Sequence, residues 1–156
     1  MAIDYYLHLG TPLAAAEVVG ELQDFAQTLS DRPVTPELLL GEGIATKRGT
    51  WIHATDTKVP SWSVMPEDFG FTPTVTVSFR QDKFTDTLAQ TDDMIRLTSY
   101  LLDHVPGDAA LHFEFEYIML LRRDGELSLN ERSDIWSPQR LAMVRQSYQR
   151  ATYKFS

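Results

Sequence analysis

The sequence contains no cysteine. This absence excludes disulfide bonds, thiolate zinc sites and cysteine nucleophiles, and it fits a reducing compartment. Basic residues are also scarce, because 14 Lys and Arg stand against 22 Asp and Glu and leave a formal charge of −8. Such a surface repels phosphate backbones, so we expect no nucleic-acid partner.

Long apolar runs are missing as well. The longest uninterrupted one, residues 117–121, is far shorter than the roughly 20 residues that cross a bilayer. The N-terminus also lacks the basic region and apolar core of a secretory signal. We therefore expect a cytoplasmic protein that has no membrane contact. The sequence leaves its oligomeric state open.

The sequence also lacks catalytic motifs. No Gly-x-Ser-x-Gly turn occurs, and Gly41-Glu-Gly43 lacks the third glycine and the lysine of a phosphate-binding loop. Neither His-x-His nor His-x-x-x-His spacing is found. We accordingly expect no enzymatic activity, no cofactor and no metal site.

The residues that are present describe an ordinary globular chain. Apolar residues make up 43% of the sequence and aromatic residues 11%. A chain of 156 residues buries about 68–70% of its unfolded surface without help from disulfides or metals. We expect a single domain that spans residues 1–156.

Alternation of apolar and polar residues predicts the strands. It places a first strand at residues 3–9, another at 74–80 and a long one at 111–121. Asp124-Gly125 is the strongest turn signal in the sequence and leads the last of these into a partner strand at 126–130. A weaker hairpin is predicted around Gly49, between residues 44–48 and 50–54.

Apolar residues at helical spacing predict two long helices, at residues 12–29 and 86–105. Thr11 and Pro12 suit the start of the first. Residues 38–40 form either one helical turn or a short strand, and Ser137-Pro138 opens a short C-terminal helix. Residues 56–70 make a long surface connection, and loops of this length are often functional.

Together these elements predict an α+β fold: a mainly antiparallel sheet with two long helices on one face and a short C-terminal helix. Two helices cover one face only, so the other face is expected to be open to contact. Alternation assigns to the open face a set of polar and aromatic residues: Asp4, Tyr6, His8, Thr76, Ser78, Arg80, His112, Glu114 and Glu116. We expect cross-strand ion pairs there, for example Arg80 with Glu114.

The three tryptophans divide differently. Trp51 lies in a predicted strand and is expected in the core, whereas Trp136 precedes a helix start and is expected to hold that helix down. Trp62 is either a packed anchor of the 56–70 loop or an exposed binding contact. We favour the packed arrangement, because a large loop aromatic generally finds cover.

Four stretches carry a family resemblance. They are Pro66-Glu-Asp-Phe-Gly-Phe-Thr-Pro-Thr-Val-Thr-Val-Ser-Phe-Arg80, Asp82-Lys-Phe84, Leu121-Arg-Arg-Asp-Gly-Glu-Leu127 and Ser133-Asp-Ile-Trp136. In this order, around a Met-Ile-Arg-Leu helix, they resemble bacterial immunity proteins of the swarming-inhibition toxin type, the SitI family. The layout is similar over residues 1–150, although the motifs cover only 66–136.

The resemblance implies an antidote that binds a cognate toxin and occludes it, as in toxin–antitoxin systems of interbacterial competition. It carries over no catalytic residues. Our hypothesis is that the partner contacts the open face and the loop through Tyr6, His8, Trp62, Arg80, His112, Glu114 and Glu116. The alternative is a small enzyme or ligand-binding domain with a pocket between the sheet and the 56–70 loop, using His8 or His112.

Overall fold

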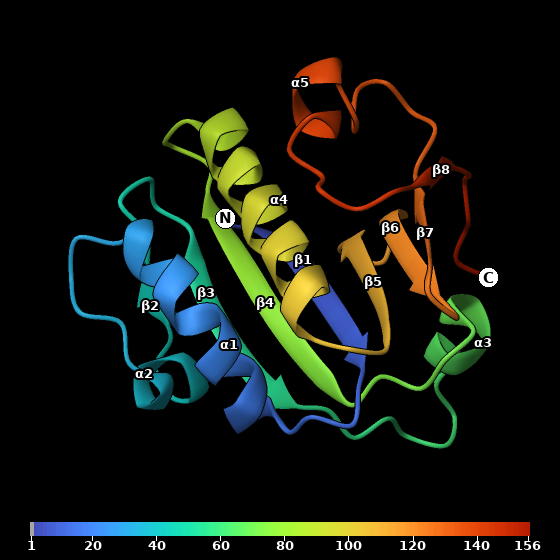
Figure 1. Cartoon of the computed structure of the whole chain (residues 1–156), viewed down its shortest axis with the longest axis horizontal. Helices are drawn as coiled ribbons and strands as arrows, with labels where there is room; N and C mark the ends of the chain where they lie inside the picture. The colour runs from blue at the N-terminus through green and yellow to red at the C-terminus, as the bar shows by residue number, and fades with distance from the viewer. Residues whose placement is uncertain (1) are drawn as a thin grey trace.

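The computed structural model describes residues 2–156 and confirms the α+β fold class. The strands are β1 (Ala2–Gly10), β2 (Ile44–Ala45), β3 (Trp51–Asp56), β4 (Val75–Asp82), β5 (Asp108–Phe113), β6 (Tyr117–Arg123), β7 (Glu126–Leu129) and β8 (Gln149–Arg150). Among these residues they form one eight-stranded sheet in the order β2-β3-β4-β1-β5-β6-β7-β8 (Figure 1). Neighbouring strands are antiparallel except for the short β7–β8 pair.

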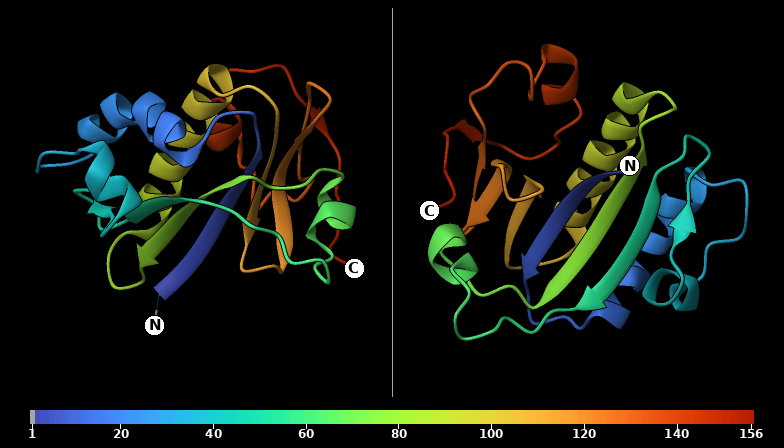
Figure 2. Two further views of the ribbon diagram at one scale, coloured as in Figure 1. Left: turned by 90° about the horizontal axis from the view of Figure 1, so that it is seen from below. Right: turned by 180° about the vertical axis from the view of Figure 1, so that it is seen from behind.

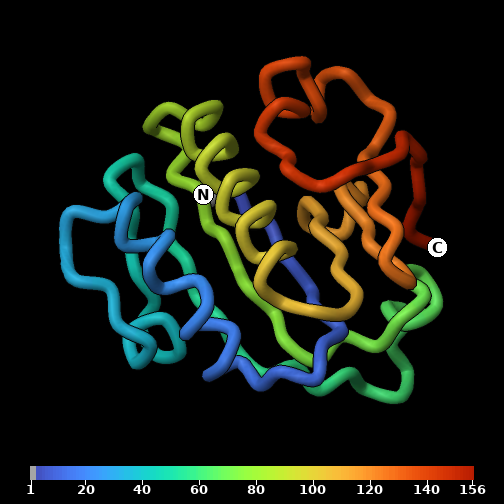
Figure 3. Tube along the Cα trace, in the orientation of Figure 1, coloured from blue at the N-terminus to red at the C-terminus, as the bar shows by residue number. Residues whose placement is uncertain are grey.

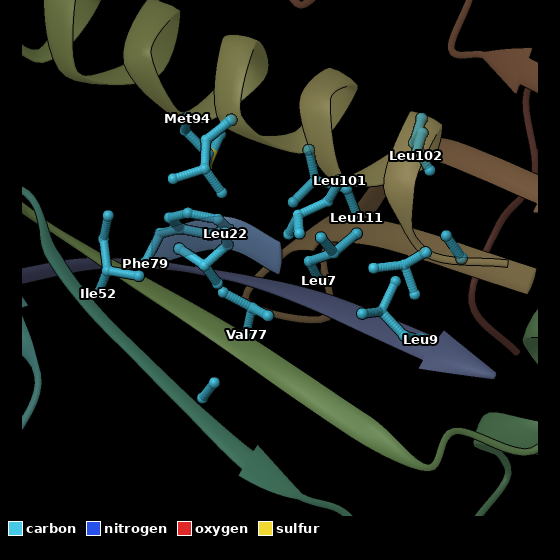
Figure 4. Close-up of a cluster of buried hydrophobic side chains, with 14 of the residues drawn as sticks. Leu7, Leu9, Leu22, Ile52, Val77, Phe79, Met94, Leu101, Leu102 and Leu111 are labelled. Carbon is cyan, nitrogen blue, oxygen red and sulfur yellow. The ribbon is translucent and has the colours of Figure 1, made fainter. Parts of the chain in front are cut away.

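Two long helices, α1 (Ala15–Thr28) and α4 (Thr87–His104), lie across the same face of the sheet, which we call the front face (Figures 1 and 2). Leu7 and Leu9 of β1 meet Leu22 of α1 and Leu101 of α4 in the core between these layers (Figure 4). Full burial of each such side chain contributes about 1.5–3 kcal/mol. No helix among residues 2–156 has the length and apolar character that a membrane crossing needs.

Three short helices complete the chain: α2 (Pro36–Leu40), α3 (Met65–Phe69) and α5 (Pro138–Leu141). Of the two alternatives for residues 38–40, the structure has the helix, and the Thr35 hydroxyl accepts a hydrogen bond from the Leu38 N–H. The connection at 56–70 contains α3. The C-terminal helix starts after Ser137 as predicted but ends at Leu141, and the chain continues around the molecule to β8 (Figure 3).

The predicted β6–β7 hairpin is confirmed. Arg123 pairs with Glu126, and both residues of the two-residue loop have positive φ, 52° at Asp124 and 81° at Gly125. Those angles are the ones that a type I′ turn requires, and Asp-Gly is a favoured sequence for it. Local turn chemistry therefore fixes the register of this hairpin.

The predicted long strand at 111–121 is wrong, because the chain reverses at Glu114–Glu116 and forms a β5–β6 hairpin instead. Glu114 and Phe115 adopt positive φ angles of 45° and 61° without any glycine. The Phe115 N–H donates to Nδ1 of His112 at 3.1 Å, and the Glu116 N–H donates to the Phe113 carbonyl at 2.7 Å. A side chain from the strand itself thus stabilises a turn that has no standard turn sequence.

Helix α1 begins later than predicted, at Ala15 rather than at Pro12. The Ala15 N–H donates to a carboxylate oxygen of Asp56, 2.9 Å away, and the Ala14 N–H donates to Glu17 at 3.2 Å. The N-terminus of α1 is therefore capped by Asp56 of β3, which is distant in sequence, and not by Thr11. A carboxylate at this position also complements the positive end of the helix dipole.

The C-terminus of α4 is held by Arg122 from β6. Its guanidinium donates to three backbone carbonyls, those of Leu102 and Val105 at 2.7 Å and that of Gly107 at 2.8 Å. The last carbonyls of a helix have no partner within the helix, so these bonds satisfy groups that would otherwise face the β5 connection. One arginine thereby fastens the second long helix to the sheet.

We expect Arg122→Met to lower the free energy of unfolding by about 2–3 kcal/mol, because it keeps the apolar stem and removes three charge-assisted hydrogen bonds. Urea unfolding followed by circular dichroism measures this change. Arg145→Ala, which removes a surface arginine paired with Asp103 at 3.6 Å, is the control and should change stability by less than about 0.5 kcal/mol. Equal effects of the two variants would contradict the capping role.

Candidate functional site

The register of β1 brings the predicted polar residues onto one face, the back face, opposite α1 and α4. Asp4 pairs with Arg80, Tyr6 with Ser78 and His8 with Thr76 on one side. On the other side Tyr6 pairs with His112 of β5. Period-two alternation therefore identified the members of this face correctly in β1 and β4, and in β5 for His112.

The back face has two halves, and only one of them is open. Over β5 and β6 it is covered by a cluster of apolar and aromatic side chains, which we call the aromatic cover: Phe69, Phe71, Phe115 and Phe155, packed with Ala110, Ile118 and Leu121. They come from α3, from the segment after it, from the β5–β6 turn and from the C-terminal segment. The expectation of a fully open face is thus wrong for this half.

His8 and His112 lie beneath the aromatic cover and not on the surface. Their exposed fractions are 5% and 0%. The ring of Phe155 stands edge-on to His112 at 5.3 Å between centroids, and Phe69 lies 5.5 Å from His8. A partner cannot reach either imidazole in this arrangement, so the predicted contacts at these two residues are not accessible.

The two buried imidazoles form a hydrogen-bond chain whose direction can be assigned. A backbone N–H always donates, so Nδ1 of His112 carries a lone pair toward Phe115, and the neutral ring has its proton on Nε2. That proton is donated to Nε2 of His8, 3.0 Å away. His8 then donates from Nδ1 to the Thr76 hydroxyl at 2.9 Å, and the hydroxyls of Thr76 and Thr57 are hydrogen-bonded to each other.

Burial keeps both histidines neutral. It lowers the pKa of His8 to about 4, because the apolar surroundings disfavour the imidazolium. Burial, together with repulsion from a charged His8, lowers the pKa of His112 to about 3. Each ring at neutral pH therefore has one donor and one acceptor, which is what the chain from Phe115 to Thr57 requires.

The open half lies over β3, β4 and β1, where Figure 2 shows the strands without a covering helix. Arg80 forms its ion pair here with Asp4, its direct neighbour in register, with Nε 2.9 Å from the carboxylate. The predicted pairing of Arg80 with Glu114 is therefore wrong. The guanidinium also lies 5.9 Å from the ring of Trp51.

Trp51 is half-buried on this open half and not in the core as predicted. Its ring stacks on His53 at 5.4 Å, and its indole N–H donates to the Glu42 carbonyl at 2.8 Å. Tyr6 is likewise half-buried, at the border with the aromatic cover, 6.1 Å from Phe115. The open half thus presents aromatic rings beside one arginine.

Glu114 and Glu116 lie in the β5–β6 turn and are exposed at the edge of the open half. A carboxylate oxygen of Glu114 accepts a hydrogen bond from the Asp4 N–H at 3.1 Å. Asp4 thus contacts both Arg80 and Glu114, and Glu116 adds a further exposed carboxylate in the same turn as Glu114.

Trp62 is 83% exposed, so the packed arrangement that we favoured is wrong. The 57–64 segment that carries it precedes α3 without regular structure. Trp136 behaves as predicted, because it is fully buried and donates its indole N–H to the Met119 carbonyl at 2.7 Å.

The geometry gives little room for chemistry at the histidines. No group of three or more His, Cys, Asp or Glu side chains in the described part of the chain is arranged to hold a metal ion. A base at His8 or His112 would have to work below the aromatic cover, where a substrate has no access. The accessible part of the candidate site is the open half of the back face, with Tyr6, Trp51 and Arg80.

We expect removal of both histidines, in His8→Phe/His112→Phe, to flatten the loss of stability in acid. In the wild type the unfolded chain binds protons below about pH 6.5, whereas the folded rings stay neutral until about pH 4 and about pH 3. The contribution of the two neutral histidines to the free energy of unfolding is therefore fully present above pH 6.5. It decreases as the pH drops, by up to about 1.4 kcal/mol per pH unit for each histidine.

Urea unfolding between pH 7 and pH 4 measures the slope, and the carboxylates that both proteins share cancel in the difference. Thr76→Val is the control, because it breaks the same hydrogen-bond chain but keeps both imidazoles, and it should retain the wild-type slope. Parallel curves for the wild type and the double variant would contradict the buried neutral pair.

One comparison with known proteins identifies a family. The model of the SitI3-like family matches residues 3–140, from β1 into α5, and so includes both long helices and the back face. No curated protein and no solved structure matches the chain. The match confirms the resemblance to SitI-type immunity proteins that the motifs between residues 66 and 136 predicted. The chain belongs to the SitI3-like family.

Proposed function

We propose that the protein is an immunity protein that binds a cognate bacterial toxin and neutralises it by occlusion. In this role it acts in the cytoplasm during interbacterial competition and needs no chemistry of its own. Membership of the SitI3-like family supports the class of function. The choice of binding surface rests on the open half of the back face, where aromatic side chains and an arginine lie exposed or half-exposed beside carboxylates.

The composition of this surface is that of a protein–protein interface. Tyr, Trp and Arg are enriched at binding hot spots, because they offer a large contact area together with hydrogen bonds. Tyr6 and Arg80 supply these groups on the strands, and Trp62 supplies a further exposed ring from the 57–64 segment. His8 and His112 contribute from below, by fixing the strands and the β5–β6 turn.

Charge indicates the kind of surface that the toxin presents. Glu114 and Glu116 are exposed in the β5–β6 turn, Glu114 contacts Asp4, and the chain as a whole carries a formal charge of −8. Complementary charge speeds encounter and selects against wrong partners. A toxin with a basic patch around its functional site would be attracted to the acidic turn and then occluded by the adjoining strands.

The test of the function uses the product of a neighbouring reading frame that encodes a secreted toxin domain. Coexpression with this protein should restore the growth of cells that produce the toxin domain, and calorimetry should detect binding with a Kd of about 1 nM to 100 nM. Growth arrest that persists in the presence of the folded protein, together with no heat of binding, would exclude this pair.

We expect Glu114→Lys/Glu116→Lys to weaken toxin binding by at least about tenfold, mainly through slower association, because it reverses the charge of the acidic turn. Surface plasmon resonance at low and high salt measures both rate constants. Glu17→Lys/Glu21→Lys reverses the same number of charges on α1, at the other face of the sheet, and should leave the affinity close to wild type. Unchanged binding by the turn variant would move the contact surface elsewhere.

A further inference from the structure

A second exposed surface lies where β4 ends and α4 begins. Phe84, just before α4, is 83% exposed, and Leu88, in the first turn of α4, is 68% exposed. Lys83 lies against the phenyl ring, with its Nζ 5.3 Å from the ring centroid. The start of β1 lies at the same end of the molecule, because Ala2 pairs with Asp82 (Figure 1). Neither apolar residue takes part in the contact surface proposed above.

The loop that carries Phe84 is held in place by a buried amide. Gln90 is fully buried, and its amide nitrogen donates to the Asp82 carbonyl at 2.8 Å and to the Thr85 hydroxyl at 2.7 Å. Its side-chain oxygen accepts from the Asp82 N–H at 2.9 Å, and the Phe84 N–H donates to the Asp82 carboxylate at 2.9 Å. The exposed ring is therefore presented on a fixed backbone, which lowers the entropy cost of binding.

A cleft of about 190 Å³ opens next to this loop, and Leu88 forms part of its wall. Its other walls are mixed: the apolar and aromatic ones come from Ile3, Tyr5, Tyr117, Met119 and Ile135, and the polar ones from Gln81, Thr87, Thr91, Asp134 and Arg140. For comparison, an apolar cavity of about 150 Å³ accommodates benzene. By volume the cleft is large enough for a phenyl ring, and the ring of Phe84, in the adjoining loop, is exposed to solvent.

We propose that this surface is self-complementary and that two copies of the chain associate through it, with Phe84 of each copy inserted into the cleft of the other. A protruding ring and a cleft on one face are what a two-fold symmetric interface requires, because the same patch must serve on both copies. Neither feature can be satisfied within one copy, since Phe84 lies outside its own cleft.

Charge at the two sites agrees with this arrangement. Lys83 accompanies the protruding ring and forms no salt bridge within residues 2–156. Asp134 and Arg140 both line the cleft. Arg140 pairs with Asp92 at 3.4 Å, whereas the Asp134 carboxylate is exposed and pairs with Arg132 at 2.7 Å. Insertion of Phe84 would bring a lysine of one copy toward the carboxylate of the other, at both ends of the interface.

Sedimentation velocity of the purified protein tests the proposal over a hundredfold concentration range up to about 1 mM, which resolves a Kd between micromolar and millimolar. The wild type should pass from monomer to dimer, and Phe84→Ser should raise the Kd at least about tenfold. Trp62→Ser removes an equally exposed ring elsewhere and should dimerise as the wild type does. Circular dichroism confirms that each variant is folded.

A charge exchange adds a second test of the same contact. Lys83→Glu alone should weaken the dimer, and Lys83→Glu/Asp134→Lys should recover part of the affinity, because the two charges then meet with exchanged signs. A wild type that stays monomeric throughout would overturn the proposal. So would a Phe84→Ser variant that dimerises unchanged, or one that stays dimeric while losing toxin binding, which would assign the ring to the toxin instead.

Discussion

The structure depends on β1, because this strand lies in the middle of the sheet and has to satisfy two different environments at once. Its odd-numbered residues, Leu7 and Leu9, are buried against α1 and α4, whereas its even-numbered residues face the back. A shift of one residue would put His8 into the apolar core and expose the leucines. The front-face packing therefore fixes the register, and the register in turn decides which polar side chains become neighbours on the back.

Among these back-face residues, one arrangement is unfavourable in free energy unless its polar groups are hydrogen-bonded. Two imidazoles are buried together, and a buried polar group without a partner costs about 1–3 kcal/mol. Here every ring nitrogen has a partner, from the Phe115 amide to the Thr57 hydroxyl. The hydrogen-bond chain links the β5–β6 turn, the three neighbouring strands β5, β1 and β4, and the segment that leads to Trp62. The buried chain therefore sets the shape of the exposed surface around it.

How much of this could be predicted from the sequence depends on where the determining contact lies. The Asp124-Gly125 turn is local, so its sequence signal was sufficient. Alternation also gave the correct members of the back face on β1 and β4. The turn at Glu114–Glu116 was missed because its stabilising acceptor is the His112 side chain, and no glycine or proline marks it.

The division of the back face could not be predicted either, because Phe69 and Phe155 are far apart in the sequence and meet only in the fold. The same holds for Arg122, whose three carbonyl acceptors lie at the end of α4. Its position after a run of apolar residues indicated only the polar end of a strand. Contacts of this kind leave no periodic pattern in one sequence, whereas the face that a strand residue occupies does.

The directed chain through His8 and His112 has a consequence for how the family can diverge. Replacing one imidazole leaves the other with an unmatched donor or acceptor below the aromatic cover, whereas replacing both by apolar residues removes the linked pair together. Relatives should therefore keep both histidines or have lost both, and mixed pairs should be rare. Substitutions at these two positions are expected to be coupled, whereas the neighbouring surface residues are free to vary independently.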